Sequence, residues 1–364
     1  MIFEMRRNSI LFIAIISLIF VSCSTNHGNE ENPKNIILLI GDGMSFAHLQ
    51  AGILGSETPL HLEEFRHIGF IHTSSADDFV TDSGAAGTAL AAGVKTNNGY
   101  VGMNPDGEPV QSILHIASEN GLSTGIVVSC AITHATPASF FAHQPSRNMT
   151  EAIALDILST DIDVIIGGGR DHLMDREDGR NLAGELENKG YVLAENMDEA
   201  MQVSSGRLAA LVAPNHPPRY DDGRGDLLPD GTEIAINIMD QNPEGFFLMV
   251  EGAQIDWGGH ANDVEYVVNE MLDFDRAVGR ALEFAKQDGE TLVIVTSDHD
   301  TGGMSIHGFD QDTREVTAAW TTGGHTGLIQ PVLAWGPGSE KFNGIYENTG
   351  VFDRMLEAFG FSRN

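Results

Sequence analysis

Acidic, histidine and threonine side chains follow four of the apolar runs in this 364-residue sequence. They are Asp42; His134 and Thr136; Glu251, Asp256 and His260; and Asp298 and His299. Mixed histidine and carboxylate ligands suit zinc, whereas sets with only oxygen ligands suit magnesium. Carboxylates that are brought together repel one another, so cations must compensate for their charge. The pattern therefore predicts a metal site.

Each of these residues also has an ordinary explanation when it is taken alone. Asp42 between two glycines is typical of a turn, and Asp256 and His260 at i and i+4 are typical of a pair on a helix face. Their joint placement at successive strand ends favours the metal site. A further histidine, His325, lies in Gly-Gly-His-Thr-Gly before the last apolar run.

Asp82 and Ser83 open a run of small residues, which predicts the N-terminus of a helix. Both are preferred helix caps, so a plain cap is one explanation. The other is a nucleophile: beside zinc and the helix dipole, the hydroxyl could lose its proton and attack phosphorus. Arg147 is either a surface arginine paired with an acid or a bidentate clamp on phosphate oxygens.

Continuous apolar runs predict strands that are buried on both faces of a parallel sheet. The runs are Asn35–Ile40, Gly125–Cys130, Asp163–Ile166, Phe246–Val250, Leu292–Val295 and Pro331–Trp335. Helical periodicity is clearest over Val264–Lys286 and weaker over Glu151–Ser159 and Arg180–Asn188, and His216–Gly225 is expected to be a loop. This alternation predicts an α/β fold with a doubly wound, mostly parallel central sheet and helices on both faces. The site should lie beyond the carboxyl ends of the strands.

The charge balance excludes a nucleic-acid-binding module. The chain has 52 acidic and 20 basic residues, a net charge of −32, which would repel phosphate backbones. With 41% hydrophobic residues a sizeable core can form.

The N-terminus is typical of an export signal. Arg6 and Arg7 precede an apolar stretch that ends in Ser22-Cys23, which resembles a bacterial lipobox. We expect residues 1–22 to be a lipoprotein-type signal peptide, 23–34 a polar tether and 35–364 a single catalytic domain. Lipid on Cys23 would place the protein in the periplasm, on a membrane or at the cell surface, with ordinary cleavage near Ser22 as the alternative. If Cys23 carries lipid, Cys130 has no disulfide partner within the chain, and we expect it to be a buried small hydrophobe.

Six motifs in order along the chain resemble the signatures of the alkaline phosphatases with a serine nucleophile, two zinc ions and one magnesium ion. They are Asn-Ile-Ile-Leu-Leu-Ile-Gly-Asp-Gly-Met, Val-Thr-Asp-Ser, His-Ala-Thr-Pro, Val-Glu-Gly-Ala-Gln-Ile-Asp-Trp-Gly-Gly-His, Thr-Ser-Asp-His and Gly-His-Thr-Gly. The resemblance runs from about Asn35 to the C-terminus. It implies an alkaline phosphatase-like fold and hydrolysis of small phosphate monoesters.

The resemblance also implies a role for each motif residue. One zinc ion would be held by Asp256, His260 and His325, the second by Asp42, Asp298 and His299, and magnesium by Asp42, Thr136 and Glu251. Ser83 would become phosphoserine, Arg147 would clamp the phosphate, and Asp82 would orient Arg147. The zinc ions, about 4 Å apart, would stabilise the entering and leaving oxygens.

Three features depart from the enterobacterial members of that family. His134 stands where they carry Asp, and Trp257 where they carry Lys. We expect this pair to alter magnesium affinity and water-mediated phosphate contacts and to leave the reaction type unchanged. The segment from His299 to His325 is short, which implies a small or absent crown and leaves homodimerisation open.

Two other functions compete with that of a broad-specificity alkaline phosphomonoesterase. A phosphodiesterase or sulfatase of the same superfamily would share the metal motifs, although Ser83 with Arg147 favours monoesters, which have one more free oxygen to bind. A noncatalytic metal-binding lipoprotein would require a broken site, whereas the ligand positions and the nucleophile are intact.

Overall fold

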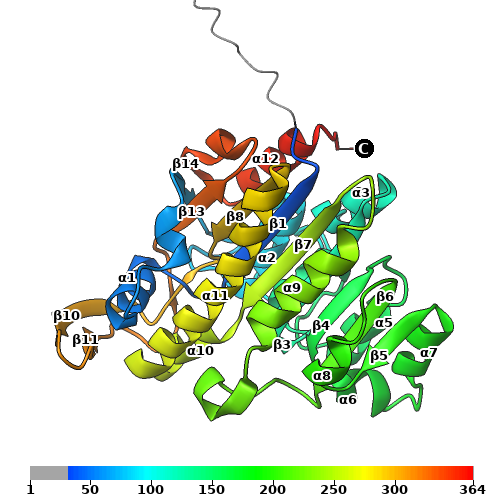
Figure 1. The fold of residues 1–364 in the computed structure, drawn as a ribbon, viewed down its shortest axis with the longest axis horizontal. Helices are drawn as coiled ribbons and strands as arrows, with labels where there is room; N and C mark the ends of the chain where they lie inside the picture. Colours follow the sequence, from blue (N-terminus) through cyan, green and yellow to red (C-terminus); the bar gives the residue numbers. More distant parts are fainter. Residues whose placement is uncertain (1–31, 364) are drawn as a thin grey trace, which may run out of the picture. The chain divides into compact units, whose positions relative to one another are not determined.

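The computed structural model describes residues 32–363, which are built around one ten-stranded sheet (Figure 1). The strand order is β14-β2-β13-β8-β1-β7-β3-β4-β6-β5. The strands are β1 Asn35–Gly41, β2 His67–His72, β3 Ser123–Ala131, β4 Val164–Gly168, β5 Tyr191–Ala194, β6 Arg207–Ala213, β7 Phe246–Gly252, β8 Thr291–Thr296, β13 Gln330–Trp335 and β14 Gly344–Glu347. The mostly parallel sheet expected from the apolar runs is confirmed.

Helices cover both faces of this sheet. They are α1 Phe46–Gly55, α2 Ser83–Ala92, α3 Ile113–Glu119, α4 Ala135–Phe141, α5 Thr150–Asp156, α6 Arg170–Met174, α7 Leu182–Asn188, α8 Met197–Ala200, α9 Leu227–Met239, α10 Gln254–Ala261, α11 Val264–Asp288 and α12 Thr349–Phe359. In Figure 1, α9 and α11 lie in front of the central strands, whereas α2, α3 and α12 lie behind them.

Alternation along β1 shows why these strands are continuously apolar. Ile36, Leu38 and Ile40 belong to the core on one face of the sheet, and Ile37 and Leu39 belong to the core on the other. All five are fully buried. Because successive side chains point to opposite faces, a strand covered on both sides needs an apolar residue at every position.

One predicted strand runs against the others. β13 pairs antiparallel with both β8 and β2. The physical reason is the connection, because parallel neighbours need a long crossover, usually a helix, and no helix lies between Thr296 and Gln330. The predicted loop 216–225 also contains one π-helical turn, Tyr220–Arg224.

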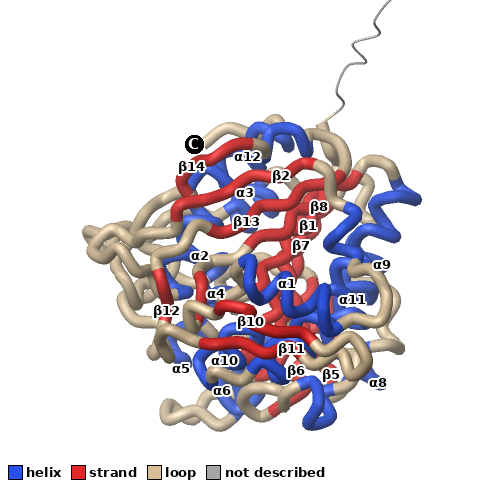
Figure 2. Tube along the Cα trace, turned by 90° about the vertical axis from the view of Figure 1, so that its left-hand side faces the viewer, coloured by secondary structure: helices blue, strands red, loops and turns tan. Residues whose placement is uncertain are grey.

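The segment from His299 to His325 forms two small β-ladders. It contains β9 Asp300–Thr301, β10 Ser305–Phe309 and β11 Val316–Ala319, and β12 is His325–Thr326. The β10–β11 hairpin packs beside α1 (Figure 2).

The predicted signal peptide, the Cys23 anchor and most of the tether lie outside the described residues. Within residues 32–363, none of the helices combines the length and apolar character that a membrane span requires.

Candidate active site

Four adjacent strands bring the predicted ligands together. β8, β1, β7 and β3 are neighbours in the sheet and run parallel. Ile40 lies opposite Glu251, and the Asp42 N–H donates to the Gly252 carbonyl at 3.2 Å, so the ends of β1 and β7 stay in register. The expected gathering of acidic and histidine residues at the carboxyl edge is therefore present.

The first group contains Asp256, His260 and His325. Asp256 Oδ1 lies 3.3 Å from His260 Nε2 and 3.5 Å from His325 Nε2, and the two histidine Nε2 atoms are 3.2 Å apart. Asp256 and His260 share one face of α10 because they are four residues apart. These ligand-type atoms are close enough together to hold one ion.

Backbone carbonyls orient both imidazoles of this first group. His260 Nδ1 lies 2.7 Å from the Gly323 carbonyl, and His325 Nδ1 lies 2.9 Å from the Thr81 carbonyl. A hydrogen bond from Nδ1–H to a carbonyl leaves Nε2 free as a lone-pair donor. Each ring therefore presents Nε2 toward Asp256.

The second group contains Asp42, Asp298 and His299, which are all fully buried. His299 Nε2 lies 3.5 Å from Asp42 Oδ1 and 3.2 Å from Asp298 Oδ2. Ser83 Oγ lies 3.2 Å from the same nitrogen. The serine hydroxyl is thus placed at the edge of a candidate metal site.

Ser83 is the first residue of α2, as the run of small residues predicts. Asp82 is the N-cap, and its carboxylate accepts from the Ala85 N–H at 2.9 Å. The same carboxylate accepts from Arg147 Nη1 at 3.0 Å, which ties the arginine to the helix start. Both explanations of Asp82 hold together, because it caps the helix and also orients Arg147.

The third group contains Asp42, Thr136 and Glu251. The Thr136 hydroxyl donates to Asp42 Oδ2 at 3.3 Å, and Glu251 interacts with both residues. An oxygen-only set of this kind suits magnesium.

Unpartnered buried atoms show that the groups fit metal ions. Asp42 Oδ1, Glu251 Oε1 and Asp298 Oδ2 are buried and have no hydrogen-bond partner within the described residues. Buried carboxylate oxygens without a partner are unusual and costly. Divalent cations would satisfy these atoms and compensate for the gathered negative charge.

In the second and third groups, the carboxyl pKa values are those of buried carboxylates whose negative charge is not offset by enough nearby positive charge. Burial, and then repulsion from Asp298, raises the pKa of Asp42 well above its ordinary value. Burial raises the pKa of Asp298 to about 6 and that of Glu251 to about 7. Burial also lowers the pKa of His299 well below its ordinary value, so this ring is neutral and free to bind a metal.

These pKa values give a pH dependence for metal binding. In the metal-free protein Asp298 and Glu251 carry protons below pH about 6 and about 7, and an incoming cation must displace them. We expect the affinity of the group that contains Asp298 for its cation to fall by up to roughly tenfold per pH unit below about pH 6, and that of the group that contains Glu251 to fall likewise below about pH 7. Competition with a chromogenic chelator between pH 5 and 8 measures this, and a flat profile would contradict it.

His134 and Trp257 lie at the edge of the site, as the resemblance implies. Arg147 Nη2 lies 3.4 Å from His134 Nε2, and the His134 ring meets the Trp257 ring edge-on at 6.1 Å. His216 completes this aromatic cluster, with its ring centroid 4.9 Å from that of Trp257.

Three residues that lie at the site were not predicted from the sequence to belong to it. The Thr301 hydroxyl donates to Asp256 Oδ1 at 2.5 Å and lies 3.3 Å from His299 Nδ1, so it links two metal groups. His216 accepts from the Ala131 N–H, and Cys130 Sγ lies 3.3 Å from Glu251 Oε2. Only Cys130, at the end of a predicted strand, carried a usable positional signal.

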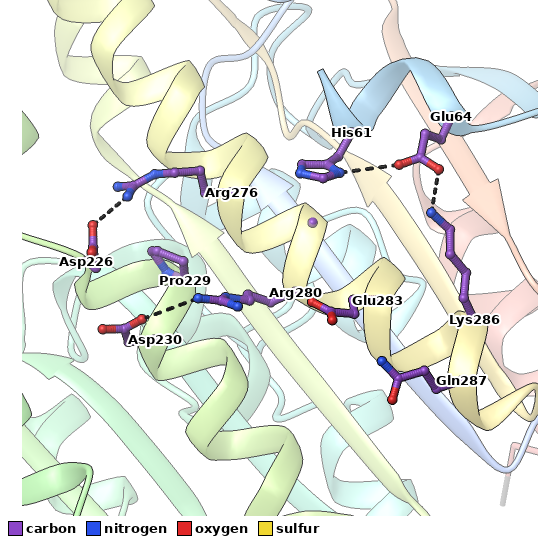
Figure 3. Close-up of a pocket in the computed structure, with 11 residues that line it drawn as sticks. His61, Glu64, Asp226, Pro229, Asp230, Arg276, Arg280, Glu283, Lys286 and Gln287 are labelled. Carbon is purple, nitrogen blue, oxygen red and sulfur yellow. Dashed lines mark hydrogen bonds and ion pairs between the residues drawn. The ribbon is translucent and has the colours of Figure 1, made fainter. Parts of the chain in front are cut away.

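A separate groove of about 510 Å³ lies along α11, near α9. Figure 3 shows its Arg276, Arg280 and Lys286 directed at acidic partners. None of the metal-group residues lines it. This groove is therefore separate from the acidic and histidine residues at the sheet edge.

The family model for alkaline phosphatase matches residues 33–318. Alkaline phosphatase 3 of Bacillus subtilis is 32% identical, over 92% of this chain and 91% of that protein. The alkaline phosphatase of Escherichia coli is 30% identical, over 91% and 87%. The solved alkaline phosphatase from the Antarctic bacterium TAB5 has 39% identity and a TM-score of 0.88, and the match covers 92% of this chain and 100% of that one.

The mostly parallel sheet, with acidic and histidine groups gathered at its carboxyl edge, is typical of metal-dependent enzymes with an α/β fold. With the comparisons, the assignment is specific: this chain belongs to the alkaline phosphatase family and is a phosphatase.

Proposed function

We propose that the protein is an alkaline phosphomonoesterase that works through a phosphoserine at Ser83. The observation that carries the proposal is the position of Ser83 Oγ, 3.2 Å from His299 Nε2 at the start of α2. The proposed zinc ligands are the first two groups, and the proposed magnesium ligands are the third. When bound, these cations would favour the serine alkoxide and stabilise charge on the oxygens around phosphorus.

The chain's own residues supply the rest of the reaction. Ser83 Oγ gives its proton to water and attacks phosphorus, the bond from phosphorus to the substrate oxygen breaks, and the departing oxygen takes a proton from water to leave as the alcohol. Water then breaks the bond between Oγ and phosphorus and releases inorganic phosphate. The N-terminus of α2 favours the phosphate charge, and the buried position of Ser83 limits other nucleophiles.

Arg147 supports a monoester substrate over a diester. Its guanidinium is held by Asp82, and the remaining N–H groups can bind two phosphate oxygens. A monoester has three non-bridging oxygens, so one remains for the cations, whereas a diester has only two in all.

The deciding experiment compares p-nitrophenyl phosphate with bis-p-nitrophenyl phosphate at alkaline pH. The full chain is assayed with chelator and after zinc and magnesium add-back. We expect metal-restored monoester turnover with little diester turnover. A diester preference would move the protein to a sister function, and no turnover by the folded, metal-loaded chain would overturn the proposal.

Arg147→Ala should weaken the handling of phosphate. We expect kcat/KM to fall about 10- to 100-fold because two charge-assisted hydrogen bonds are lost. Inhibition by inorganic phosphate, measured alongside, should weaken as well. Arg170→Ala is the matched control, because Arg170 pairs with Glu195 away from the site, and it should leave both constants unchanged.

The proposal also includes export with a lipid anchor on Cys23, at the periplasmic membrane or the cell surface. Cys23→Ser should move the activity from the membrane fraction to the soluble fraction. Equal fractionation of the two proteins would contradict the anchor. The resemblance leaves homodimerisation of the mature protein open, and light scattering decides between one and two chains.

A further inference from the structure

Residues 80–82 lead directly into the proposed nucleophile Ser83, and one asparagine holds this segment. The Asn98 side chain meets its backbone twice, because Nδ2 donates to the Val80 carbonyl at 2.9 Å and Oδ1 accepts from the Asp82 N–H at 2.9 Å. Asp82 has an extended backbone, so the segment joins α2 with little slack. The start of α2 therefore takes its position from Asn98 as well as from its own cap.

The carbonyl between those two backbone groups contacts a proposed zinc ligand. The Thr81 carbonyl lies 2.9 Å from His325 Nδ1. This hydrogen bond leaves His325 Nε2 to face Asp256. The segment that Asn98 holds is thus in contact with both the nucleophile and a metal group.

The residues that follow this asparagine hold the phosphate clamp. The Arg147 backbone N–H donates to the Gly99 carbonyl at 2.7 Å, and Val101 and Gln144 exchange two backbone hydrogen bonds of 3.1 and 3.0 Å. The Arg147 guanidinium binds the Asp82 carboxylate at 3.0 Å. One short stretch of chain therefore contacts the backbone at both ends of the ion pair between Arg147 and Asp82.

An asparagine that only completes a turn bonds within that turn. Asn104 does so, because its Oδ1 accepts from the N–H groups of Asp106 and Glu108. Asn98 differs, since its side chain bonds residues 16 and 18 positions earlier in the chain. Its own backbone is fixed as well, because its N–H donates to Asp77 Oδ1 at 2.9 Å.

We propose that Asn98 is a positioning residue that sets the distance between the nucleophile Ser83 and the phosphate clamp Arg147. The inference rests on the proposed phosphoserine function and adds a residue that acts through the backbone of its neighbours. Without the Asn98 amide, the Val80 carbonyl and the Asp82 N–H lose their partners, and the segment before α2 is free to shift. A misplacement of about 1 Å at a reacting group can lower a rate about 100-fold.

The test compares Asn98→Ala with Asn97→Ala in the full chain loaded with zinc and magnesium. Asn97 is the matched control, because the one hydrogen bond of its side chain within the described residues goes to the Pro105 carbonyl. Binding of inorganic phosphate is measured by isothermal titration calorimetry. We expect the dissociation constant to rise at least about 10-fold in Asn98→Ala and to stay within about twofold in Asn97→Ala. No change in Asn98→Ala, or an equal change in both variants, would overturn the inference.

Turnover supplies a readout that a purely structural role would not move. We expect kcat for p-nitrophenyl phosphate to fall about 10- to 100-fold in Asn98→Ala, with slower labelling of the enzyme by ³²P-phosphate. A fall in kcat that only matches the unfolded fraction, measured by circular dichroism, would contradict the positioning role. If Asn98→Ala does not fold, Asn98→Asp decides, because it keeps the acceptor for the Asp82 N–H and lacks the donor to the Val80 carbonyl. Phosphate binding by Asn98→Asp within about twofold of the wild type would overturn the inference.

Wild-type turnover in the same experiment separates the two proposals. Turnover by the wild type with unaltered phosphate binding and kcat in Asn98→Ala leaves the phosphatase mechanism standing and removes the positioning role. Weaker phosphate binding by Asn98→Ala without any wild-type turnover keeps the positioning of the phosphate clamp and contradicts the proposed mechanism.

Discussion

Ser83→Ala is expected to lower kcat by about 10⁴-fold or more, because the nucleophile is the one group whose loss no other residue can replace. The site offers no second hydroxyl in an equivalent place: Thr136 is committed to Asp42. Alanine is an excellent helix former, so α2 and its Asp82 cap should persist. Steady-state turnover measures the loss, and acid-quenched labelling with ³²P-phosphate should find no phosphoenzyme.

Two further variants serve as controls for the Ser83→Ala prediction. Ser112→Ala removes a buried serine that caps α3, so we expect a stability loss of about 1 kcal/mol and unchanged turnover. His134→Asp should keep turnover within about tenfold while raising the response to magnesium, because it adds a hard oxygen beside Glu251. Equal loss in Ser83→Ala and His134→Asp would contradict the expectation that the residue at position 134 leaves the reaction type unchanged.

The core strands could be predicted because burial on both faces forces uninterrupted apolar runs, as in β1 and β7. Strands near the sheet edges could not. β14 is mostly exposed and short, and β2 alternates between buried and exposed positions, so neither contains such a run. The helix α9 was not predicted because Pro229 and Gly231, which disfavour helix interiors, lie in its first turns. Proline is tolerated there because the first N–H groups of a helix have no helical acceptor.

The gathering of acidic and histidine residues could be predicted because, apart from His325, each of them follows a buried strand at the same edge of the sheet. Their supporting residues follow no such rule. Thr301 supports Asp256 from 45 positions away in the chain, and the contact depends on how β9 folds back over α10. Cys130 had a strand-end position but no expected partner, since its carboxylate comes from a strand that lies 121 positions later.

Removal of the metal ions is expected to abolish turnover and to lower the thermal stability together. An ion present at 100 times its dissociation constant adds about 2.7 kcal/mol to stability. Each kcal/mol corresponds to roughly 2–4 °C in a domain of 150–250 residues. For the three proposed sites we expect a fall in Tm of about 10 °C or more on chelation. Differential scanning calorimetry with and without EDTA measures it, and zinc with magnesium should reverse it.

Asp298→Asn is expected to change the stability of the protein in opposite directions with and without metal. At pH 8 Asp298, whose pKa burial raises to about 6, is charged at a cost when no cation is present. The asparagine oxygen can still accept from the Gly43 and His299 N–H groups that Asp298 Oδ1 now binds. We therefore expect the variant to be more stable than the wild type without metal and less stable with it.

A matched buried acid separates this effect from a general loss of charge. Asp275 is also buried, but its carboxylate accepts from the backbone N–H groups of His61 and Leu62 and touches no metal group. Burial raises the pKa of Asp275 as well, and Asp275→Asn should change stability by the same amount with and without metal. If Asp298→Asn also changes stability equally with and without metal, the fold alone holds the carboxylates together at the sheet edge. Cation binding would then not be the reason why they lie close to one another.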